Sequence, residues 1–380
     1  MLEKKKRIFL SPPHMGGKEL YYVEKVFESN YIAPVGPAIE KFEAEMATLL
    51  DIPFTVAVSS GTAAMHLAVR HLGIGPGDMV LASTLTFIGS VSPVTYQGGE
   101  LWFVDSDFET WNMDPNLLAE GIEQCINKCG VPPKAVIPTD IYGNCVDLDA
   151  ITKVCDMYDI PVIVDSAESL GSTYKGKHAG KGGYASVYSF NGNKIITTGS
   201  GGLLASDDEN LIKHARKLAS QAKDVRPYYH HTEIGYNYRM SNVLAAIGLG
   251  QLQVLQERVN RCREINRLYK KHLKNVEGVS FIPEPSYGRS NCWLTVILLD
   301  PKVCKKGPED VRVALEIENI ESRRVWKPMH MQPVFAKSRV IGGLVAERLF
   351  ETGLCLPSGT SMTDGEVELV AETIKKTLTA

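Results

Sequence analysis

The chain has 380 residues, of which 44% are hydrophobic and 22% charged, and its formal net charge is −3. This length and composition are typical of a soluble globular protein with a substantial core, organised as one large domain and a smaller one. Nucleic-acid and membrane-surface partners are disfavoured, because a pI near 6.3 gives no basic surface of the kind such partners require.

The start of the chain and its cysteines favour a cytoplasmic protein. The basic stretch 1–7 is followed by the Ser-Pro-Pro stretch 11–13, not by the apolar run and small-residue cleavage site of a signal peptide. No run of about 20 apolar residues, the length that a membrane-spanning helix needs, occurs in the sequence. The eight cysteines form no CxxC pair and no histidine accompanies Cys125 and Cys129, so we expect reduced thiols and no metal site.

From about residue 54 to residue 206, short apolar runs alternate with stretches of helical periodicity, a pattern typical of a mostly parallel sheet covered on both faces. The predicted strands are, in chain order, Thr55–Val58, Met79–Ala82, Leu101–Val104, Ala135–Pro138, Val162–Val164, Ala185–Ser189 and Gly202–Ala205. The predicted helices between them include Thr62–Leu72, Asp114–Cys129 and Leu148–Tyr158. These elements predict a large α/β domain that, with an N-terminal arm, takes up residues 1–241.

After Met240 the pattern changes to one long helical stretch rich in Leu, Ala, Glu and Arg. We predict that residues 242–275 form a helix that connects the large domain to a smaller α+β domain of residues 276–380. The predicted elements of the smaller domain are the strands Val279–Ile282 and Cys292–Leu299 and the helices Pro308–Glu318, Leu344–Thr352 and Thr363–Thr377.

Lys194 is the first candidate for catalysis. It ends the sequence Ser189-Phe-Asn-Gly-Asn-Lys194, after a predicted strand and before a turn rich in glycine and hydroxyl residues. Shelter from water favours the neutral amine over the ammonium, and only the neutral amine attacks an aldehyde to form a Schiff base. A lysine beside glycines is more often a solvated loop residue, so this interpretation depends on the segments around it.

Asp165 follows a predicted strand, at the edge where open α/β sheets bind their ligands. A pyridoxal cofactor needs an acidic partner there, because a carboxylate stabilises the protonated ring nitrogen that lets the ring withdraw electrons. The alternative is that Asp165 only caps a helix. Lys194, on the next strand-turn unit, favours the cofactor.

Two further segments complete a candidate cofactor site. The segment Ser59-Ser-Gly-Thr-Ala-Ala64 lies between a strand and a helix, where the backbone N–H groups of Gly61 and Thr62 can bind a phosphate with help from Ser189. Phe87 follows the strand 79–82 and can stack on a flat cofactor. Taken alone, these segments fit a capped helix and a core phenylalanine equally well.

Together these segments resemble the DegT/DnrJ/EryC1/StrS sugar aminotransferases, a family of fold-type I pyridoxal-phosphate enzymes. The likeness runs over nearly the whole chain, and its motifs stand in the family's order and spacing. They are Ser59-Ser-Gly-Thr-Ala-Ala64, Asp165-Ser-Ala-Glu168, Ser189-Phe-Asn-Gly-Asn-Lys194 and Gly235-Tyr-Asn-Tyr-Arg-Met-Ser241. The resemblance implies a large three-layer domain with a mostly parallel sheet and a small C-terminal α+β domain.

Other segments look most like one branch of the family, the UDP-N-acetylbacillosamine-type 4-aminotransferases. They are Phe9–Met15, Ser29–Pro34, Arg289–Trp293, Arg324–His330 and Leu356–Gly359. The resemblance implies transfer of an amino group from glutamate to C4 of a UDP-linked 4-keto-6-deoxy-N-acetylhexosamine, with pyridoxamine phosphate as the second form of the cofactor. Ser200 and Val325 depart from the commonest pattern, which has Glu and Pro there, and this puts the substrate fit in doubt.

The same resemblance implies roles for individual residues. Lys194 links to the cofactor and moves the proton between cofactor and sugar, Asp165 pairs with the ring nitrogen, and Glu168 approaches the ring hydroxyl. Asn237 reaches the phosphate of the neighbouring subunit, so a symmetric homodimer with shared sites is expected. The residues expected to hold the phosphate within one subunit are Gly61, Thr62 and Ser189.

Arg239 and Arg289 are expected to bind a diphosphate or the carboxylate of glutamate, because guanidinium groups match both. The residues expected to contact the sugar and its nucleotide are His14, Asn30, Tyr31, Trp326 and His330. Ordinary loop packing is the alternative for each of them.

Two other functions stay open. One is an aminotransferase for another nucleotide-linked keto-sugar, with a GDP-linked, dTDP-linked or 3-keto substrate, because fold alone does not separate these reactions. The other is a non-catalytic regulatory subunit that kept the fold, which the intact Lys194 and Asp165 disfavour.

Overall fold

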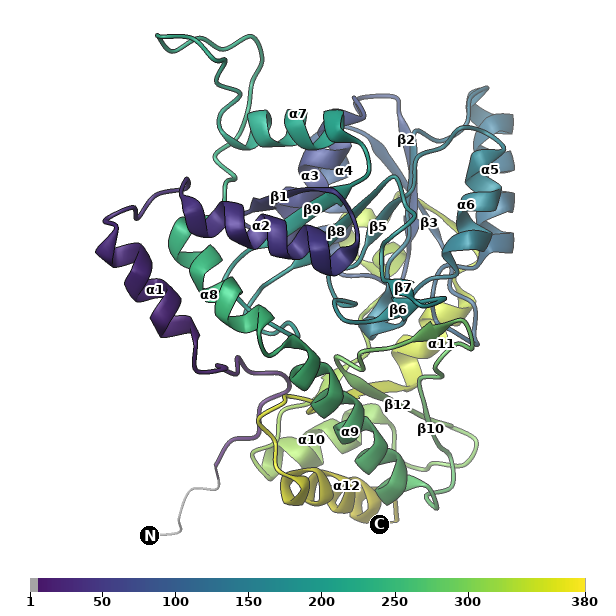
Figure 1. Cartoon of the computed structure of the whole chain (residues 1–380). Coiled ribbons are helices and arrows are strands. Elements are labelled where there is room, and N and C mark those ends of the chain that lie inside the picture. The colour runs from purple at the N-terminus through teal and green to yellow at the C-terminus, as the bar shows by residue number, and fades with distance from the viewer. Residues whose placement is uncertain (1–5, 380) are drawn as a thin grey trace.

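The large domain is built on one central sheet (Figure 1), in a computed structural model that describes residues 6–379. The beginning of the basic stretch 1–7 therefore lies outside the described residues. The strands of the sheet are β1 (Phe54–Val58), β2 (Met79–Ser83), β3 (Glu100–Val104), β4 (Ala135–Ile137), β5 (Ile163–Asp165), β8 (Ala185–Ser189), β9 (Gly202–Ser206) and β14 (Arg339–Ile341).

The order across this sheet is β14-β3-β2-β4-β5-β8-β9-β1, with isolated parallel bridges joining the β4 and β5 segments. Neighbouring strands are parallel except where β9 pairs with β8 and with β1. The predicted α/β fold with a mostly parallel sheet is confirmed. The carboxyl ends of β5 and β8 therefore lie side by side at one edge.

Helices cover both faces of the sheet. Successive side chains of a strand point to opposite faces, and here both sets are apolar. In β3, Phe103 packs with α3, α4 and α7 on one face, whereas Trp102 packs with α5 and α6 on the other. The second face is continued over β8, β9 and β1 by α2 and α8. The helices are α1 (Glu19–Glu28), α2 (Pro37–Leu50), α3 (Gly61–His71), α4 (Ser92–Tyr96), α5 (Pro115–Cys129), α6 (Leu148–Asp156), α7 (Glu209–Ala219), α8 (Asn242–Leu252), α9 (Leu255–Leu273), α10 (Pro308–Ile317), α11 (Leu344–Thr352) and α12 (Asp364–Thr379).

The small domain has an antiparallel sheet of order β10-β12-β15-β13. One face of it packs on α9, α10 and α12. Val296 and Leu298, on the other face, join Trp111 and Tyr142 of the large domain in a shared apolar cluster. The strands of this sheet are β10 (Val279–Phe281), β12 (Thr295–Leu299), β13 (Arg323–Arg324) and β15 (Gly353–Leu356), and a separate small sheet contains β6 (Thr173–Tyr174), β7 (Lys177–His178) and β11 (Gly288–Arg289).

The structure differs from the predicted elements in several places. The expected single helix over 242–275 is wrong: the chain leaves helical geometry at Val254, where ψ is 3°, so that α8 packs on α1 and α2 while α9 packs on α12. One strand of the stretch 276–380, β14, pairs with β3 in the large sheet. The helices α1, α2, α4 and α7 and the strands β6, β7, β11, β13, β14 and β15 were not predicted. In α1 the exposed face carries Leu20, Tyr21 and Phe27, which hides the helical periodicity. The division at 241 and 275 stays a prediction.

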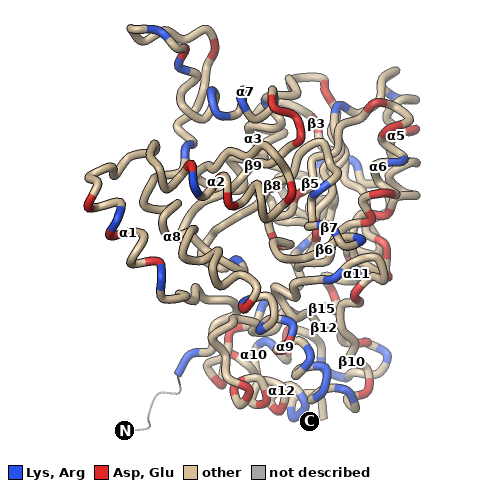
Figure 2. The backbone as a smooth tube through the Cα atoms, in the orientation of Figure 1, with Lys and Arg blue, Asp and Glu red and all other residues tan. Residues whose placement is uncertain are grey.

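Basic and acidic residues are interspersed over both domains (Figure 2). Within residues 6–379, no helix is both long and apolar enough to span a membrane. The same residues contain no group of three or more His, Cys, Asp or Glu arranged to hold a metal ion.

Candidate active site

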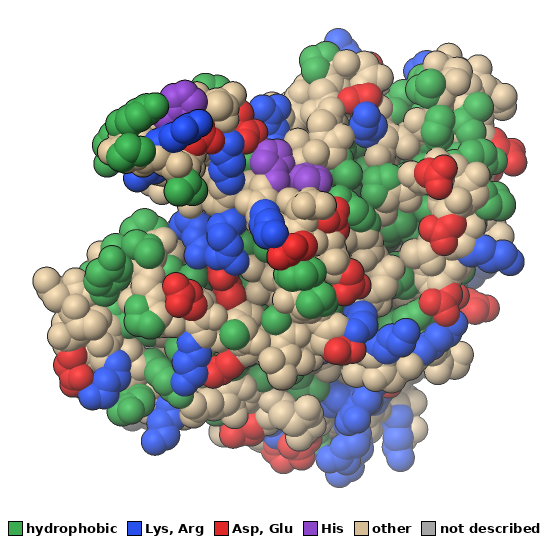
Figure 3. Space-filling view, turned by 45° about the horizontal axis from the view of Figure 1, so that its top comes forward, with side chains coloured by type: hydrophobic (Ala, Val, Ile, Leu, Met, Phe, Trp, Pro, Cys, Tyr) green, Lys and Arg blue, Asp and Glu red, His purple; other side chains and the backbone are tan. Residues whose placement is uncertain are grey.

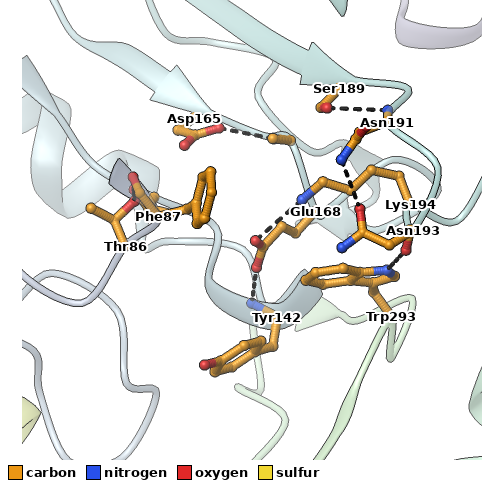
Figure 4. Close-up of polar contacts among 12 residues, drawn as sticks. Thr86, Phe87, Tyr142, Asp165, Glu168, Ser189, Asn191, Asn193, Lys194 and Trp293 are labelled. Atoms are coloured by element: carbon orange, nitrogen blue, oxygen red, sulfur yellow. Dashed lines mark hydrogen bonds and ion pairs between the residues drawn. The ribbon is translucent and has the colours of Figure 1, made fainter. Parts of the chain in front are cut away.

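A cavity of about 1040 Å³ opens at the sheet edge where β5 and β8 end and α3 begins, and residues of the small domain form its opposite wall. Residues predicted for the site are thereby brought together from distant parts of the sequence (Figure 4). The predicted residues that line the cavity are Gly61, Thr62, Phe87, Asp165, Glu168, Ser189, Lys194 and Trp326.

Lys194 lies in the turn that follows β8, and its side chain is only 12% exposed. Its Nζ is 3.4 Å from Oε1 of Glu168 and 4.2 Å from the centroid of the Trp293 ring (Figure 4). The indole N–H of Trp293 donates to the carbonyl of Asn193 at 2.7 Å, which fixes the ring beside the lysine backbone. The amine is therefore enclosed between a carboxylate and an aromatic face, and the predicted sheltered lysine is what the structure shows.

Asp165 ends β5 and is buried beneath the cavity. Its carboxylate accepts from the Ser90 hydroxyl and from the N–H of Ala167 at 3.0 Å. Burial raises the pKa of this carboxyl, and the two hydrogen bonds oppose the shift. A cationic partner on the cavity side would offset the cost of burying the ionised group.

Glu168 is also buried, at 4% exposure, and it is the partner of the amine. Its Oε2 accepts from the N–H of Tyr142 at 2.7 Å. Burial raises the pKa of Glu168 to about 7, although the positive charge of Lys194 acts in the opposite direction. Tyr142 has a φ of 51°, a conformation uncommon for residues other than glycine, and this conformation places its N–H at the carboxylate.

Asn291 is completely buried and connects Glu168 to Trp293, the two residues that contact the amine of Lys194. Its Nδ2 donates to the carbonyls of Glu168 at 2.7 Å and Leu170 at 2.9 Å, while its Oδ1 accepts from the N–H of Trp293 at 2.8 Å. One side-chain amide thus holds a loop of the large domain against a segment leading to the small domain. Neither Asn291 nor Trp293 was predicted as a site residue.

Asp140 supports the same region from behind. Its carboxylate is buried and accepts from the hydroxyls of Ser166 and Ser169 at 2.8 and 2.6 Å and from the N–H of Val146 at 2.9 Å. Burial raises the pKa of Asp140 to about 6. These bonds fix the turn that carries Tyr142.

The N-terminus of α3 forms the other side of the cavity. The Ser60 hydroxyl caps the helix by accepting from the N–H of Ala63 at 3.0 Å. A Cβ added to Gly61 would lie 3.2 Å from the Cβ of Ser189, and one added to Gly202 would lie 2.3 to 2.4 Å from backbone atoms of Ser60 and Gly61. The glycines therefore let the three segments meet where helix N–H groups attract an anion.

Phe87 and Trp326 form an aromatic wall. The side chain of Phe87 is 58% exposed and its ring centroid lies 5.6 Å from that of Trp326, which in turn is 5.1 Å from that of Tyr142. Phe87 is thus part of the cavity and not of the core, which removes the alternative left open by the sequence. A flat ring has an aromatic surface to pack against here.

Two predicted substrate residues are already engaged elsewhere. Arg239 donates to the Glu43 carboxylate at 2.8 Å and to the carbonyl of Ala57 at 3.1 Å, outside the cavity. His330 lies 2.6 Å from the Thr84 hydroxyl and 3.0 Å from the Glu347 carboxylate, and it does not line the cavity either. Within one subunit, both side chains connect structural elements and neither reaches the cavity, so their contact with substrate stays a prediction.

The other predicted residues lie outside the cavity within the same subunit. His14 contacts the Thr360 hydroxyl at 2.9 Å and lines a small neighbouring space that also touches Lys194. Asn237 is exposed and pairs with Ser220 in an isolated bridge. The remaining three, which lie on exposed segments, are Asn30, Tyr31 and Arg289.

Several cavity residues were not among the predicted site residues. They include Ser90, Trp293, Arg323, Arg324 and Lys327. Trp293, Arg324 and Lys327 belong to segments already noted for their resemblance, whereas nothing in the sequence distinguishes Ser90 from other serines.

A buried aspartate, an enclosed lysine and a helix N-terminus at the carboxyl edge of a mostly parallel sheet fit a flat cofactor with a cationic ring nitrogen, a reactive carbonyl and a phosphate. Asp165 and Glu168 can carry two negative charges in the inner part of the cavity, and Lys194 can carry one positive charge. The second negative charge can therefore compensate a cationic ring nitrogen of the cofactor. These features define a fold-type I pyridoxal-phosphate enzyme.

Comparison with known proteins gives the family. The chain belongs to the DegT/DnrJ/EryC1/StrS aminotransferase family, whose model matches residues 13–375. Family membership confirms the predicted class and cofactor: the chain is a pyridoxal-phosphate-dependent aminotransferase that acts on nucleotide-linked sugars.

Three similar proteins illustrate the relationship. The chain is 46% identical to the putative pyridoxal phosphate-dependent aminotransferase EpsN of Bacillus subtilis, over 97% of this chain and 95% of that protein. It is 37% identical to the GDP-perosamine synthase of Escherichia coli O157:H7, over 96% of each chain. The crystal structure of the aminotransferase TlmJ from Streptoalloteichus hindustanus superposes with a TM-score of 0.91 at 31% identity, covering 98% of this chain and 99% of that one.

From the contact between Trp293 and Lys194 we predict that Trp293 contributes to the catalytic step but not to the binding of glutamate. We expect Trp293→Leu to lower kcat about 10- to 100-fold and to change the KM for glutamate less than about threefold, because misplacing the amine affects proton transfer first. Trp293→Phe keeps a ring face and is expected to recover most of kcat. Steady-state kinetics with Trp326→Leu as the control checks this, since Trp326 lines the cavity without contacting the amine. An unchanged kcat in Trp293→Leu would contradict it.

Asp140 predicts a pH-dependent effect on stability. Its pKa in the folded protein, about 6, lies above the ordinary value of 3.8, so ionisation of Asp140 destabilises the folded state. This destabilisation is complete above pH 6 and disappears as the pH falls towards 4 and the carboxyl becomes protonated. Asp140→Asn removes the charge and keeps an acceptor for Val146. We expect the difference in free energy of unfolding, variant minus wild type, to be about 1 to 3 kcal/mol larger at pH 8 than at pH 4.5. Thermal unfolding at both pH values tests this, with the exposed Asp156→Asn as control, and a larger gain at pH 4.5 would contradict it.

Proposed function

We propose that this chain transfers the amino group of glutamate to C4 of a UDP-linked 4-keto-6-deoxy-N-acetylhexosamine and releases the UDP-linked 4-amino sugar. One observation supports this substrate: segments that resemble the 4-aminotransferases contribute directly to the cavity. They are residues 9–13, Trp293 and residues 324–327. A GDP-linked keto-sugar is the second candidate, because the chain is 37% identical to a GDP-perosamine synthase.

The chemistry is divided between the cofactor and the side chains. Bound pyridoxal phosphate supplies the carbonyl that exchanges oxygen for an amino group and the ring that withdraws electrons from the reacting carbon. Asp165 is placed to hold a protonated ring nitrogen. Lys194, once its amine is neutral, takes a proton from one reacting carbon and returns it to another, and Glu168 holds the amine between these events.

The phosphate end of the cofactor is assigned to the segments at the start of α3. Gly61 and Thr62 line the cavity in the first turn of the helix, where N–H groups have no partner within the helix, and Ser189 lies against Gly61. Phe87 supplies an aromatic face for the ring. These assignments, and that of Glu168 near the ring hydroxyl, are part of the proposal.

We further propose that the active unit is a homodimer in which Asn237 serves the partner's site. The segment between α7 and α8 projects from the body of the subunit (Figure 1), and hydrophobic side chains gather on it (Figure 3). Val225, Tyr228, Tyr229 and Ile234 are exposed on this segment, with Val225 fully exposed. Exposed apolar groups in such number are typical of a surface that another subunit covers.

Lys194→Ala is expected to fold normally and to lose turnover by at least about three orders of magnitude, because no other group replaces the amine. In the wild type, glutamate should change the absorption band of the bound cofactor, and only UDP-linked keto-sugar should restore it among UDP-, GDP- and dTDP-linked substrates. Absorption spectroscopy with each nucleotide sugar measures both steps. Restoration by the GDP-linked sugar alone would select the second candidate, and absence of any response to glutamate would contradict the mechanism.

Shared sites predict complementation between two inactive variants. In a heterodimer of Lys194→Ala and Asn237→Ala subunits, one site carries both changes and the other carries neither. Co-expressed subunits with different affinity tags should therefore recover about half of the wild-type activity in the purified heterodimer. Each homodimer serves as the control. A heterodimer no more active than the two homodimers would exclude the shared site.

A further inference from the structure

The cationic side chains of the cavity fall into two groups. Among the described residues, Lys194, Arg323, Arg324 and Lys327 line it. Lys194 faces the carboxylates at the edge of the large sheet, whereas the other three belong to β13 and to the segment that follows it in the small domain. The small-domain wall is therefore the basic side of the cavity.

These three side chains differ in how far the protein satisfies them. Arg323 is paired with Glu321, to which its guanidinium donates at 2.8 and 3.2 Å. Arg324 donates through Nη2 to the carbonyls of Phe350 and Glu351 at 2.5 and 3.0 Å, but its Nε is buried without a hydrogen-bond partner.

Lys327 is the least satisfied of the three. In the part of the chain that the structure describes, its ammonium makes no hydrogen bond and no ion pair, although the residue is only partly exposed and lines the cavity. Glu321 is the one carboxylate on this wall, so the wall carries an excess of two positive charges. A charge excess of this size beside a cavity attracts an anion of matching charge.

The substrates of the proposed function share such an anion. UDP-linked and GDP-linked sugars differ in the base, but each carries a diphosphate bridge whose two phosphates bear one negative charge apiece. Lysine is a compact point charge that suits phosphate oxygens.

The position of Lys327 fits this bridge. It directly follows Trp326, which forms the aromatic wall with Phe87 and whose ring centroid lies 6.5 Å from that of Trp293, the ring beside Lys194. A sugar whose reacting carbon lies near Lys194 and whose ring passes this wall leads its diphosphate towards the segment of Lys327.

We propose that Lys327 binds the diphosphate bridge of the nucleotide sugar. The assignment rests on the proposed function for its choice of ligand, and it names a residue inside the cavity, whereas the sequence suggested Arg239 and Arg289 for a diphosphate or a glutamate carboxylate. Arg239 is occupied by Glu43, and Arg289 does not line the cavity.

The test compares nucleoside diphosphates with monophosphates, so it needs no turnover. Affinities of the cofactor-loaded protein for UDP, UMP, GDP and GMP are measured by calorimetry. We expect the wild type to prefer the diphosphate of its own nucleotide about 10- to 100-fold, and Lys327→Ala to lose about tenfold of that preference. Lys327→Arg should keep most of the preference because it keeps the charge. Lys337→Ala, which removes an exposed lysine outside the cavity, is the matched control.

A second readout separates this proposal from the proposed function. The response of the cofactor spectrum to glutamate should be unchanged in Lys327→Ala, while the KM for the nucleotide sugar rises at nearly constant kcat. The diphosphate assignment would be overturned if Lys327→Ala lost affinity for diphosphates and monophosphates to the same extent. It would also be overturned if Lys327→Ala lost the response to glutamate. A wild type that binds UDP no better than UMP and GDP no better than GMP would overturn it as well. Failure to turn over any nucleotide-linked keto-sugar would instead contradict the proposed function and leave the binding result intact.

Discussion

The active site depends on one enclosed amine. Lys194 is held between the Glu168 carboxylate at 3.4 Å and the face of Trp293 at 4.2 Å, in surroundings that exclude most water. An ammonium removed from water is stable only if a carboxylate or an aromatic face compensates for the lost solvation, and here both do. Because Glu168 belongs to the large domain and Trp293 leads into the small one, the same contact holds the two domains around the site.

The enclosure is rigid because its supporting polar groups are satisfied. Asn291 bonds to the backbone of both neighbours of the amine, and Asp140 fixes the turn whose Tyr142 N–H reaches Glu168. Buried networks of this kind specify a single arrangement when their members are paired. The lysine is therefore presented in one place, which a proton transfer between defined atoms requires.

The sequence predicted those parts that are set by local pattern. Alternating strands and helices reveal the parallel sheet, and a residue that follows a strand, such as Asp165 or Lys194, is placed at the sheet edge by the fold itself. The bond from Arg239 to Glu43 was not predicted because the two residues lie far apart in sequence, so that the sequence shows the guanidinium but not its partner. Trp293 and Ser90 were not predicted because their roles arise from contacts between segments that only the folded chain brings together.

The division of the cavity separates chemistry from recognition. The large domain supplies Asp165, Glu168 and Lys194, to which the proposed mechanism assigns the chemistry whatever sugar carries the reacting carbon. The small domain supplies the basic wall with Lys327, and a diphosphate does not distinguish one base from another. Discrimination between UDP and GDP must then come from contacts beyond the diphosphate, at the base. A change in nucleotide preference can therefore occur in this fold without disturbing Lys194. For this reason the catalytic motifs identify the family, whereas contacts with the base decide which substrate binds.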